Sequence, residues 1–285
     1  MSGWRKASRR FGALAALGLG LGAAAPALPA PARVVSVNLC TDQLAMMLAA
    51  PGQLVAVSKL ADDPLSSVMV EQARGYAKTM GQAEQVYLMH PDLVLAGTYT
   101  SRASVDLLRR LGVEVVELAP ASRLSDVTDH ILTVGAALGR EPEARALADG
   151  FAADLAALRI DAGQPVGAAM YYPNGYTTGA GTLADDILTA TGFRNIGAEA
   201  GVTGGGNLPL ERLVMAAPQM IVTSTPYPGA SRSEEILIHP ALAALRETAG
   251  QARVTDADWI CGTPHVLRAV AAMAGAYRAM TGGGS

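Results

Sequence analysis

The chain of 285 residues is poor in several features that commonly carry a function. Charged residues make up only 16% of it and the net charge is −3, which argues against a nucleic-acid partner, because such partners require dense positive charge. Two cysteines are too few for a scaffold built on disulfides. No nucleophile elbow, phosphate loop or dinucleotide fingerprint occurs. These shortages argue against nucleic-acid binding, a disulfide scaffold and the enzyme classes that those motifs mark.

Long hydrophobic runs are also missing, apart from a short one near the N-terminus. Basic residues at positions 5–10 precede the uncharged stretch 11–25, and small residues suited to cleavage follow. This layout is typical of a secretory signal peptide. A run of about fifteen apolar residues falls short of the ~20 that a membrane-spanning helix needs. We therefore expect residues 1–30 to be a cleaved signal peptide and the mature chain to be periplasmic.

Strand-like and helix-like patterns alternate through the first half of the mature chain. Short apolar or β-branched runs occur at residues 33–38, 54–58, 91–97 and 113–118, and helical spacing occurs at residues 41–50, 101–112 and 125–138. Such alternation indicates βαβ units and a mostly parallel sheet.

One long helical segment then interrupts the alternation. In residues 142–159 apolar side chains recur at three- and four-residue steps, and Pro142 occupies a first helical position. A helix of this length would measure roughly 27 Å. The alternation resumes afterwards, with strand-like runs at residues 165–172, 218–225 and 252–256 and helical patterns at residues 182–192, 208–217 and 264–280. The pattern predicts two α/β lobes joined by one helix, with a ligand cleft between them.

The predicted division of the chain follows this pattern. It comprises the signal peptide 1–30, an N-terminal lobe 31–140, a linking backbone helix 141–163, a C-terminal lobe 164–281 and a tail 282–285.

Aromatic residues are scarce, at 5% of the chain, so their positions carry weight. Six of them lie at or just past predicted strand ends: Tyr99, Tyr171, Tyr172, Tyr176, Tyr227 and Trp259. Ligands of parallel α/β sheets bind at the carboxyl ends of the strands, and rings with a polar tip suit a broad, partly apolar ligand. We expect the group to face a ligand. The alternative is that these rings cap the cores of the lobes.

Polar candidates stand near the same strand ends. Asn38 ends the first predicted strand, Cys40 and Thr41 follow it, and Arg102 follows Tyr99. The planar, charged fork of Arg102 is suited to carboxylates or phosphates on a ligand. Its alternative is a solvated residue in the first turn of a helix.

The two cysteines, Cys40 and Cys261, both follow predicted strands and leave three interpretations open. They form a disulfide at the cleft, which would imply a rigid receptor; they ligate a metal together with His265; or they are independent small apolar residues. Spacing alone does not choose among them. The four histidines do not cluster, so no local metal site is predicted.

Several stretches carry a family resemblance when they are taken in order. They are RVVSVN followed by TDQLAMMLA, VAVS, HPDLVLAG, LLRRLGVEVVEL, LGREPEARAL and LERLVMAAPQMIVT. Together they resemble the periplasmic solute-binding proteins of ABC importers that carry iron–siderophores, haem and vitamin B12. The resemblance covers nearly the whole mature chain, residues 33–281. It implies an α/β protein of two Rossmann-like lobes on one long helix, which binds cargo in the cleft and is not an enzyme.

The resemblance also implies partners. One surface glutamate per lobe pairs with arginines of the permease in such proteins, and Glu84 and Glu211 match those positions within a repeated pattern, Glu84 to Pro91 and Glu211 to Pro218. The expected partners are an ABC permease with its ATPase and a small-molecule metal chelate, with no cofactor of the protein's own. We expect a monomer. Since arginine clusters for anionic siderophores are absent, a corrinoid is favoured, followed by a ferric siderophore.

Two alternatives to this transport role remain at this point. One is an exported metal-dependent enzyme that uses Cys40, Cys261 and His265. The other is a receptor for haem or a metal that is not coupled to transport.

Overall fold

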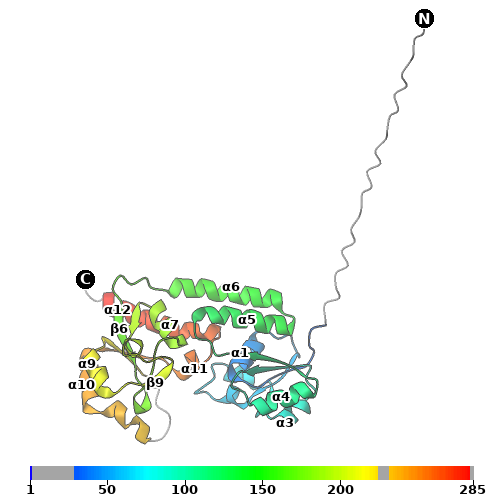
Figure 1. Cartoon of the computed structure of the whole chain (residues 1–285), viewed down its shortest axis with the longest axis horizontal. Coiled ribbons are helices and arrows are strands. Elements are labelled where there is room, and N and C mark those ends of the chain that lie inside the picture. The colour runs from blue at the N-terminus through cyan, green and yellow to red at the C-terminus, as the bar shows by residue number, and fades with distance from the viewer. Residues whose placement is uncertain (2–28, 224–230, 283–285) are drawn as a thin grey trace.

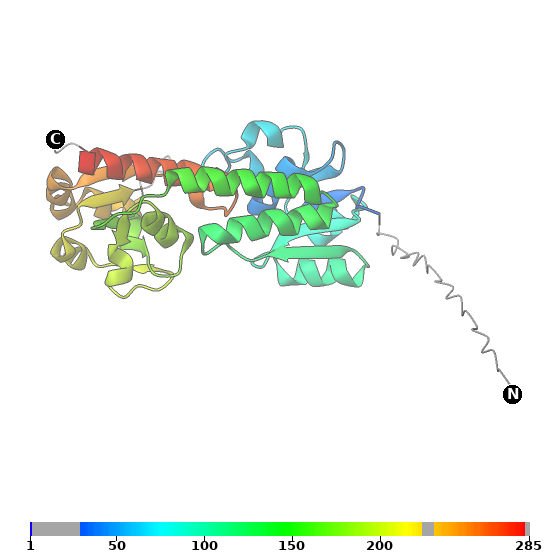
Figure 2. The same ribbon diagram turned by 90° about the horizontal axis from the view of Figure 1, so that it is seen from above.

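The computed structural model describes Met1, residues 29–223 and residues 231–282. Two parallel β-sheets lie in opposite halves of the molecule, and long helices run along one side of both (Figure 1, Figure 2). Residues 2–28 of the predicted signal peptide, and Tyr227, lie outside the described residues. In the part of the chain that is described, no helix has the length and apolar character needed to cross a membrane.

The N-terminal sheet has five parallel strands in the order β3-β2-β1-β4-β5. These are β1 (Val34–Ser36), β2 (Leu54–Ser58), β3 (Ala77–Thr79), β4 (Leu93–Gly97) and β5 (Glu114–Leu118). The chain moves outward from β1 in one direction and then returns to pair β4 with the other edge of β1. The crevice at the carboxyl ends of β1 and β4 is therefore the topological switch point, where ligands of such sheets bind.

Alternating residues of these strands face two different helix layers. Val34 and Leu95 join one core cluster with α1 and α5, whereas Val35 and Val94 join another with α3 and α4. Because a parallel sheet is covered on both faces, its strands are apolar throughout, which explains why the sequence pattern located them. The helices are α1 (Leu39–Leu48), α2 (Val70–Ala73), α3 (Ala83–Tyr87), α4 (Arg102–Arg110) and α5 (Leu124–Leu138), with the 3₁₀ helix η1 (Lys59–Asp62).

The C-terminal sheet repeats this plan with four parallel strands in the order β11-β10-β6-β8. They are β6 (Val166–Met170), β8 (Phe193–Asn195), β10 (Met220–Thr223) and β11 (Gly250–Arg253). Its switch point lies between β6 and β10. The helices are α7 (Leu183–Ala190), α8 (Ile196–Glu199), α9 (Leu210–Ala216), α10 (Pro240–Thr248), α11 (Asp256–Trp259) and α12 (Leu267–Gly282), with 3₁₀ helices η2 (Pro173–Gly175), η3 (Arg232–Ile238) and η4 (Pro264–Val266). A small antiparallel pair, β7 (Tyr176–Thr178) and β9 (Gly205–Asn207), was not predicted.

The linking helix is α6 (Glu141–Leu158), close to the segment that its apolar spacing predicts. It packs on α5 of the first lobe and on α12 of the second (Figure 2). The approach of α5 and α6 is so close that a Cβ on Gly135 would stand 2.1 Å from the Cβ of Ala144. Ala144, Phe151 and Leu155 of α6 belong to one core cluster that includes residues of both sheets. A single apolar core therefore passes from lobe to lobe beneath α6, as a stiff link requires.

Two predicted boundaries need correction. The helix ends at Leu158 and does not reach residue 163, because Arg159 takes an extended backbone conformation with ψ 143°. Gly282, which was assigned to the tail, is the last residue of α12. The α/β fold class, with two Rossmann-like lobes on one long helix, is confirmed.

Candidate ligand-binding site

The N-terminal edge of the site is the start of α1. The Asn38 side-chain oxygen accepts hydrogen bonds from the backbone N–H groups of Cys40 (3.0 Å) and Thr41 (3.3 Å), so Asn38 is the N-cap of α1. This cap starts the helix at Leu39, two residues earlier than predicted. Thr41 is fully buried and its hydroxyl donates to the Asn38 carbonyl at 2.9 Å. Thr41 therefore supports this turn rather than a ligand.

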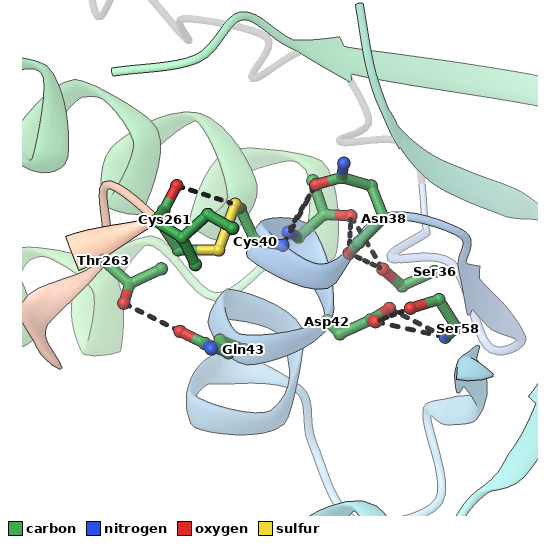
Figure 3. The surroundings of a disulfide bond; sticks show 10 residues. Ser36, Asn38, Cys40, Asp42, Gln43, Ser58, Cys261 and Thr263 are labelled. Carbon is green, nitrogen blue, oxygen red and sulfur yellow. Dashed lines mark hydrogen bonds between the residues drawn. A yellow bond between two sulfur atoms is a disulfide. The ribbon is translucent and has the colours of Figure 1, made fainter. Parts of the chain in front are cut away.

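Asp42 fixes the same turn to the end of β2. Its carboxylate accepts hydrogen bonds from the Ser58 backbone N–H at 3.1 Å and from the Ser58 hydroxyl at 2.5 Å (Figure 3). Asp42 is fully buried, and this burial raises the pKa of its carboxyl group to about 6. The folded state therefore binds a proton at Asp42 more tightly than the unfolded chain does.

The raised pKa predicts that stability declines as the pH rises. The contribution of Asp42 is fully present below the ordinary pKa of 3.8 and is lost as the pH increases toward and through about 6. Between pH 5 and pH 7.5, linkage gives a loss of roughly 1 kcal/mol in the free energy of unfolding. Urea denaturation of wild type and Asp42→Asn across this range checks it, because the variant should lack this slope. Asp129→Asn, the same change on an exposed position of α5, should keep it; equal slopes in wild type and Asp42→Asn would contradict the assignment.

A cavity of about 110 Å³ opens at the β1–β4 switch point. Its lining includes Asn38, Cys40, Tyr99, His130 and Ile260. Tyr99 is 88% exposed at the edge of this cavity. Its ring is therefore accessible to a ligand, as the prediction of a ligand-facing residue requires. Arg102 is not in this lining, because its guanidinium is directed to Glu117 at 3.8 Å.

The larger cavity, of about 500 Å³, lies at the β6 end of the second sheet. Tyr172, Tyr176 and Trp259 form its aromatic wall. The Tyr172 ring meets the Trp259 ring edge-on at 6.0 Å, and its centroid lies 6.4 Å from that of Tyr176. Tyr171 points to the opposite side, into a separate core cluster, because neighbouring residues after a strand alternate in direction. Tyr171 was therefore wrongly grouped with the ligand-facing rings.

The hydroxyl of Tyr172 is the most informative polar atom of this cavity. The side chain is 8% exposed, and its oxygen has no hydrogen-bond partner among the described residues. Burial raises the pKa of Tyr172 well above its usual value, and the nearby Asp256 and Tyr176 add to this effect. The phenol therefore stays neutral and keeps a proton to donate. A buried, unpaired donor is unfavourable unless another molecule accepts from it.

The remaining lining is apolar apart from two carboxylates and two threonines. Sequence reasoning missed Glu234, Leu237, Asp256 and Ile260, which come from η3, α11 and the residue after α11. Neither arginine nor lysine occurs among the described residues that line either cavity. Only the aromatic signal pointed to this wall. Asp256 was expected to end the strand-like run 252–256, whereas it begins α11.

Residues 259–263, here called the cleft segment, join the two cavities. Ile260 lines both of them. Cys261 forms a disulfide with Cys40, with the two Cα atoms 5.1 Å apart (Figure 3). The Thr263 hydroxyl donates to the buried Gln43 side chain at 2.9 Å, and Gly262 packs so closely on Ala121 that a Cβ would stand 2.2 Å from the alanine methyl. The second lobe is thus fastened to α1 at the bottom of the cleft.

Of the three cysteine interpretations, the disulfide is the correct one. Independent cysteines and a metal set of Cys40, Cys261 and His265 are wrong, since both sulfurs are bonded to each other. His265 is half-buried and lines neither cavity; burial lowers its pKa, as does the nearby Arg268. No group of three or more potential metal ligands occurs among the residues described.

Comparisons with known proteins agree with this architecture. A family model described as periplasmic binding protein matches residues 34–258. A cobalamin-binding protein of Halobacterium salinarum is 26% identical over 88% of this chain and 70% of its own length. The fold is similar to that of the periplasmic heme-binding protein RhuT from Roseiflexus sp. RS-1 in apo form, with TM-score 0.70 and 22% identity over 86% of this chain and 98% of that one. It is also similar to the periplasmic vitamin B12 binding protein BtuF of Vibrio cholerae, with TM-score 0.67 and 20% identity over 87% and 97% of the two chains.

Proposed function

Because this chain belongs to the periplasmic binding protein family, we propose that it captures a corrinoid in its interlobe cleft and delivers it to an ABC importer. The protein is a binding protein of the vitamin B12, siderophore and haem type, and not an enzyme. In such proteins the bound molecule is cargo rather than a cofactor. A ferric siderophore is the second candidate ligand.

The proposal rests on the aromatic cavity and on the buried hydroxyl of Tyr172, which has no hydrogen-bond partner among the described residues. A volume of about 500 Å³ is within the range of small-molecule sites, and Ile260 lines both cavities. Tyr172, Tyr176 and Trp259 offer flat apolar contact to a macrocycle. The Tyr172 hydroxyl offers one hydrogen bond to a carbonyl oxygen of the kind that rings the corrin periphery.

Charge favours a corrinoid over anionic cargo. Glu234 and Asp256 line the larger cavity, and no cation stands among its described lining residues. Haem carries two propionates and many ferric siderophores are anionic, so such ligands would meet carboxylates of like charge there. The corrin ring of a corrinoid presents neutral amides at its periphery, and this part of the ligand avoids the repulsion. The cobalamin-binding relative is consistent with that preference.

Titration calorimetry with purified protein tests the ligand class. Cyanocobalamin and dicyanocobinamide, haemin and ferrichrome are compared under the same conditions. We expect a corrinoid to bind with a dissociation constant below about 10 μM and the other two to bind at least tenfold more weakly. Tight binding of ferrichrome alone would establish the second candidate, and binding of none would refute the proposal.

The proposed cellular setting is the periplasm, reached through the cleaved signal at residues 1–30. The family to which the chain belongs supports this location. The relative from Bacillus subtilis described as an ABC transporter substrate-binding lipoprotein, 26% identical over 68% of this chain and 64% of its own length, supports an importer as partner.

Glu84 and Glu211 are the proposed contacts to the permease. Glu84 lies in the first turn of α3 and Glu211 in the first turn of α9, and both are exposed. Neither side chain has an ion-pair partner among the described residues. Each of these two helices thus presents a carboxylate without an ion pair among the described residues, suited to a cation on a partner.

Removing both carboxylates should impair docking without changing ligand binding. For the double variant Glu84→Gln, Glu211→Gln we expect about tenfold weaker binding of loaded protein to the reconstituted importer at low salt, mainly through slower association. Surface plasmon resonance on importer in nanodiscs measures it, and cyanocobalamin calorimetry should match wild type. Glu141→Gln, Glu143→Gln on α6 is the matched control. If the double variant bound the importer as tightly as wild type does, Glu84 and Glu211 would not be the contacts to the permease.

A further inference from the structure

The polar groups that line the larger cavity are of two unequal kinds. Glu234 in η3 and Asp256 at the start of α11 contribute two carboxylates. A carboxylate only accepts hydrogen bonds, and it has about four positions at which it can do so. Neither lysine nor arginine lines this cavity in the part of the chain that is described. The cavity therefore offers charged acceptors to a ligand, and those residues add no charged donor.

The hydroxyl donors of the same cavity are neutral, and two of them are already used within the protein. The Thr178 hydroxyl donates to the sulfur of Met170 at 3.0 Å, and the Thr182 hydroxyl donates to the Gly179 carbonyl at 2.9 Å. The Tyr172 hydroxyl differs from them, because it is buried and has no hydrogen-bond partner among the described residues. A buried donor without a partner is unfavourable, so we expect the ligand to supply an acceptor for it.

This free donor lies close to one of the charged acceptors. Burial raises the pKa of Tyr172 well above its usual value, and the nearby negative charge of Asp256 raises it further. The hydroxyl nevertheless does not donate to that carboxylate. A group that accepts from the phenol and donates to the carboxylate would satisfy both residues. A primary amide does so, because its oxygen accepts and its nitrogen donates two hydrogen bonds.

We infer that the larger cavity binds a primary amide of the ligand and rejects a carboxylate at the same place. Tyr172 donates to the amide oxygen, and Asp256 and Glu234 accept from the amide N–H groups. These three residues therefore determine specificity. The inference rests on the proposed function and narrows its ligand to a corrinoid whose peripheral acid side chains have been converted to amides.

Two physical effects distinguish an amide from a carboxylate in this cavity. A carboxylate has no N–H group, so the carboxylates of Asp256 and Glu234 would lose their partner. It also brings a negative charge close to two others, which lowers affinity by an amount that salt reduces. An ester of the same acid has neither the N–H group nor the charge. Comparison of the amide, the ester and the acid therefore measures the two effects separately.

Three derivatives of one corrin provide this test: the heptaamide, the heptamethyl ester and the heptacarboxylate of dicyanocobyrinic acid. Binding is measured through quenching of Trp259 fluorescence, since this ring lines the cavity. We expect the heptaamide to bind at least tenfold more tightly than the ester, because the ester cannot donate to the charged acceptors. It should bind at least a hundredfold more tightly than the heptacarboxylate, and this second difference should decrease at high salt.

A double variant, Glu234→Gln, Asp256→Asn, tests whether these carboxylates cause the preference. Each new side chain keeps an acceptor oxygen and loses the charge. The preference for the heptaamide over the heptacarboxylate should fall at least tenfold. Glu234→Gln alone should lower it severalfold, and this single variant leaves the start of α11 intact if the double variant does not fold.

The matched control is Glu235→Gln, Glu247→Gln. Glu235 follows Glu234 in η3 and Glu247 lies on α10; both are exposed and neither lines the cavity. The control removes the same charge from the same lobe and should keep the wild-type preference. Tyr172→Phe removes the phenol donor and should weaken binding of the heptaamide and of the ester alike, by about threefold to tenfold, because both ligands keep a carbonyl oxygen.

Each remaining outcome is decisive. If the heptacarboxylate binds wild type as tightly as the heptaamide does, the inference is overturned, while capture of a corrinoid stands. If the ester binds as tightly as the heptaamide, the amide N–H groups make no hydrogen bonds in the cavity, and the inference is again wrong. An unchanged preference in the Glu234→Gln, Asp256→Asn variant would place its cause elsewhere in the protein. If wild type binds neither these derivatives nor cyanocobalamin, the proposed function itself fails.

Discussion

Replacing Trp259 by alanine is expected to weaken corrinoid binding by about a hundredfold, or about 2.8 kcal/mol. The ring is half-buried at the end of α11, lines the larger cavity and supports Tyr172 edge-on at 6.0 Å. Its removal takes away ligand contact and also loosens Tyr172, whose buried hydroxyl is the proposed donor. Calorimetry with cyanocobalamin measures the change. Trp259→Phe keeps a flat ring and should lose less than tenfold.

The matched control removes a ring of the same lobe that is outside the site. Tyr277 on α12 meets Phe193 edge-on at 5.4 Å and lines neither cavity. Tyr277→Ala should lower the melting temperature but leave the affinity for cyanocobalamin unchanged. If Trp259→Ala folds and binds as tightly as wild type, the aromatic cavity is not the ligand site.

The sequence predicted the strands around this site more accurately than the directions of the side chains within it. Strand positions followed from short apolar runs, and three of the aromatic residues at their ends, Tyr172, Tyr176 and Trp259, line one cavity. It did not distinguish Tyr171 from Tyr172, because a single residue decides which face of the sheet a side chain meets. The direction of Arg102 toward Glu117 also depends on how α4 packs beside β5, which no local pattern encodes.

The segments around Glu84 and Glu211 show the same limit. The repeat of glutamate and proline is visible in the sequence, but the exposure of Leu88 and Met215 is not, since an apolar residue in a short helix is ordinarily counted as core. A long-range feature such as the disulfide is still less accessible, because spacing does not define pairing.

Replacing Cys40 and Cys261 together by serine is expected to lower the free energy of unfolding by about 5 kcal/mol, because a disulfide constrains the unfolded chain more as the loop that it closes becomes longer. Here the sequence separation is 221 residues, which spans nearly the whole folded chain. Urea denaturation of oxidised wild type and of the double variant measures the difference. Dithiothreitol should bring wild type to the stability of the variant and leave the variant unchanged.

The same variant also tests how the cleft is held. With the disulfide removed, the cleft segment keeps the Thr263–Gln43 hydrogen bond and the packing of Gly262 on Ala121 at its contact with the first lobe. The segment carries Trp259 and Ile260 into the site, so its release should weaken corrinoid binding by a few-fold, well short of the effect of Trp259→Ala. The core under α6 remains, and small-angle scattering should show lobes that stay connected but separate more widely in the unliganded state. A stability change below about 1 kcal/mol would contradict a disulfide that closes so long a loop. A large stability change with unaltered affinity would show that α6 alone sets the geometry of the cleft.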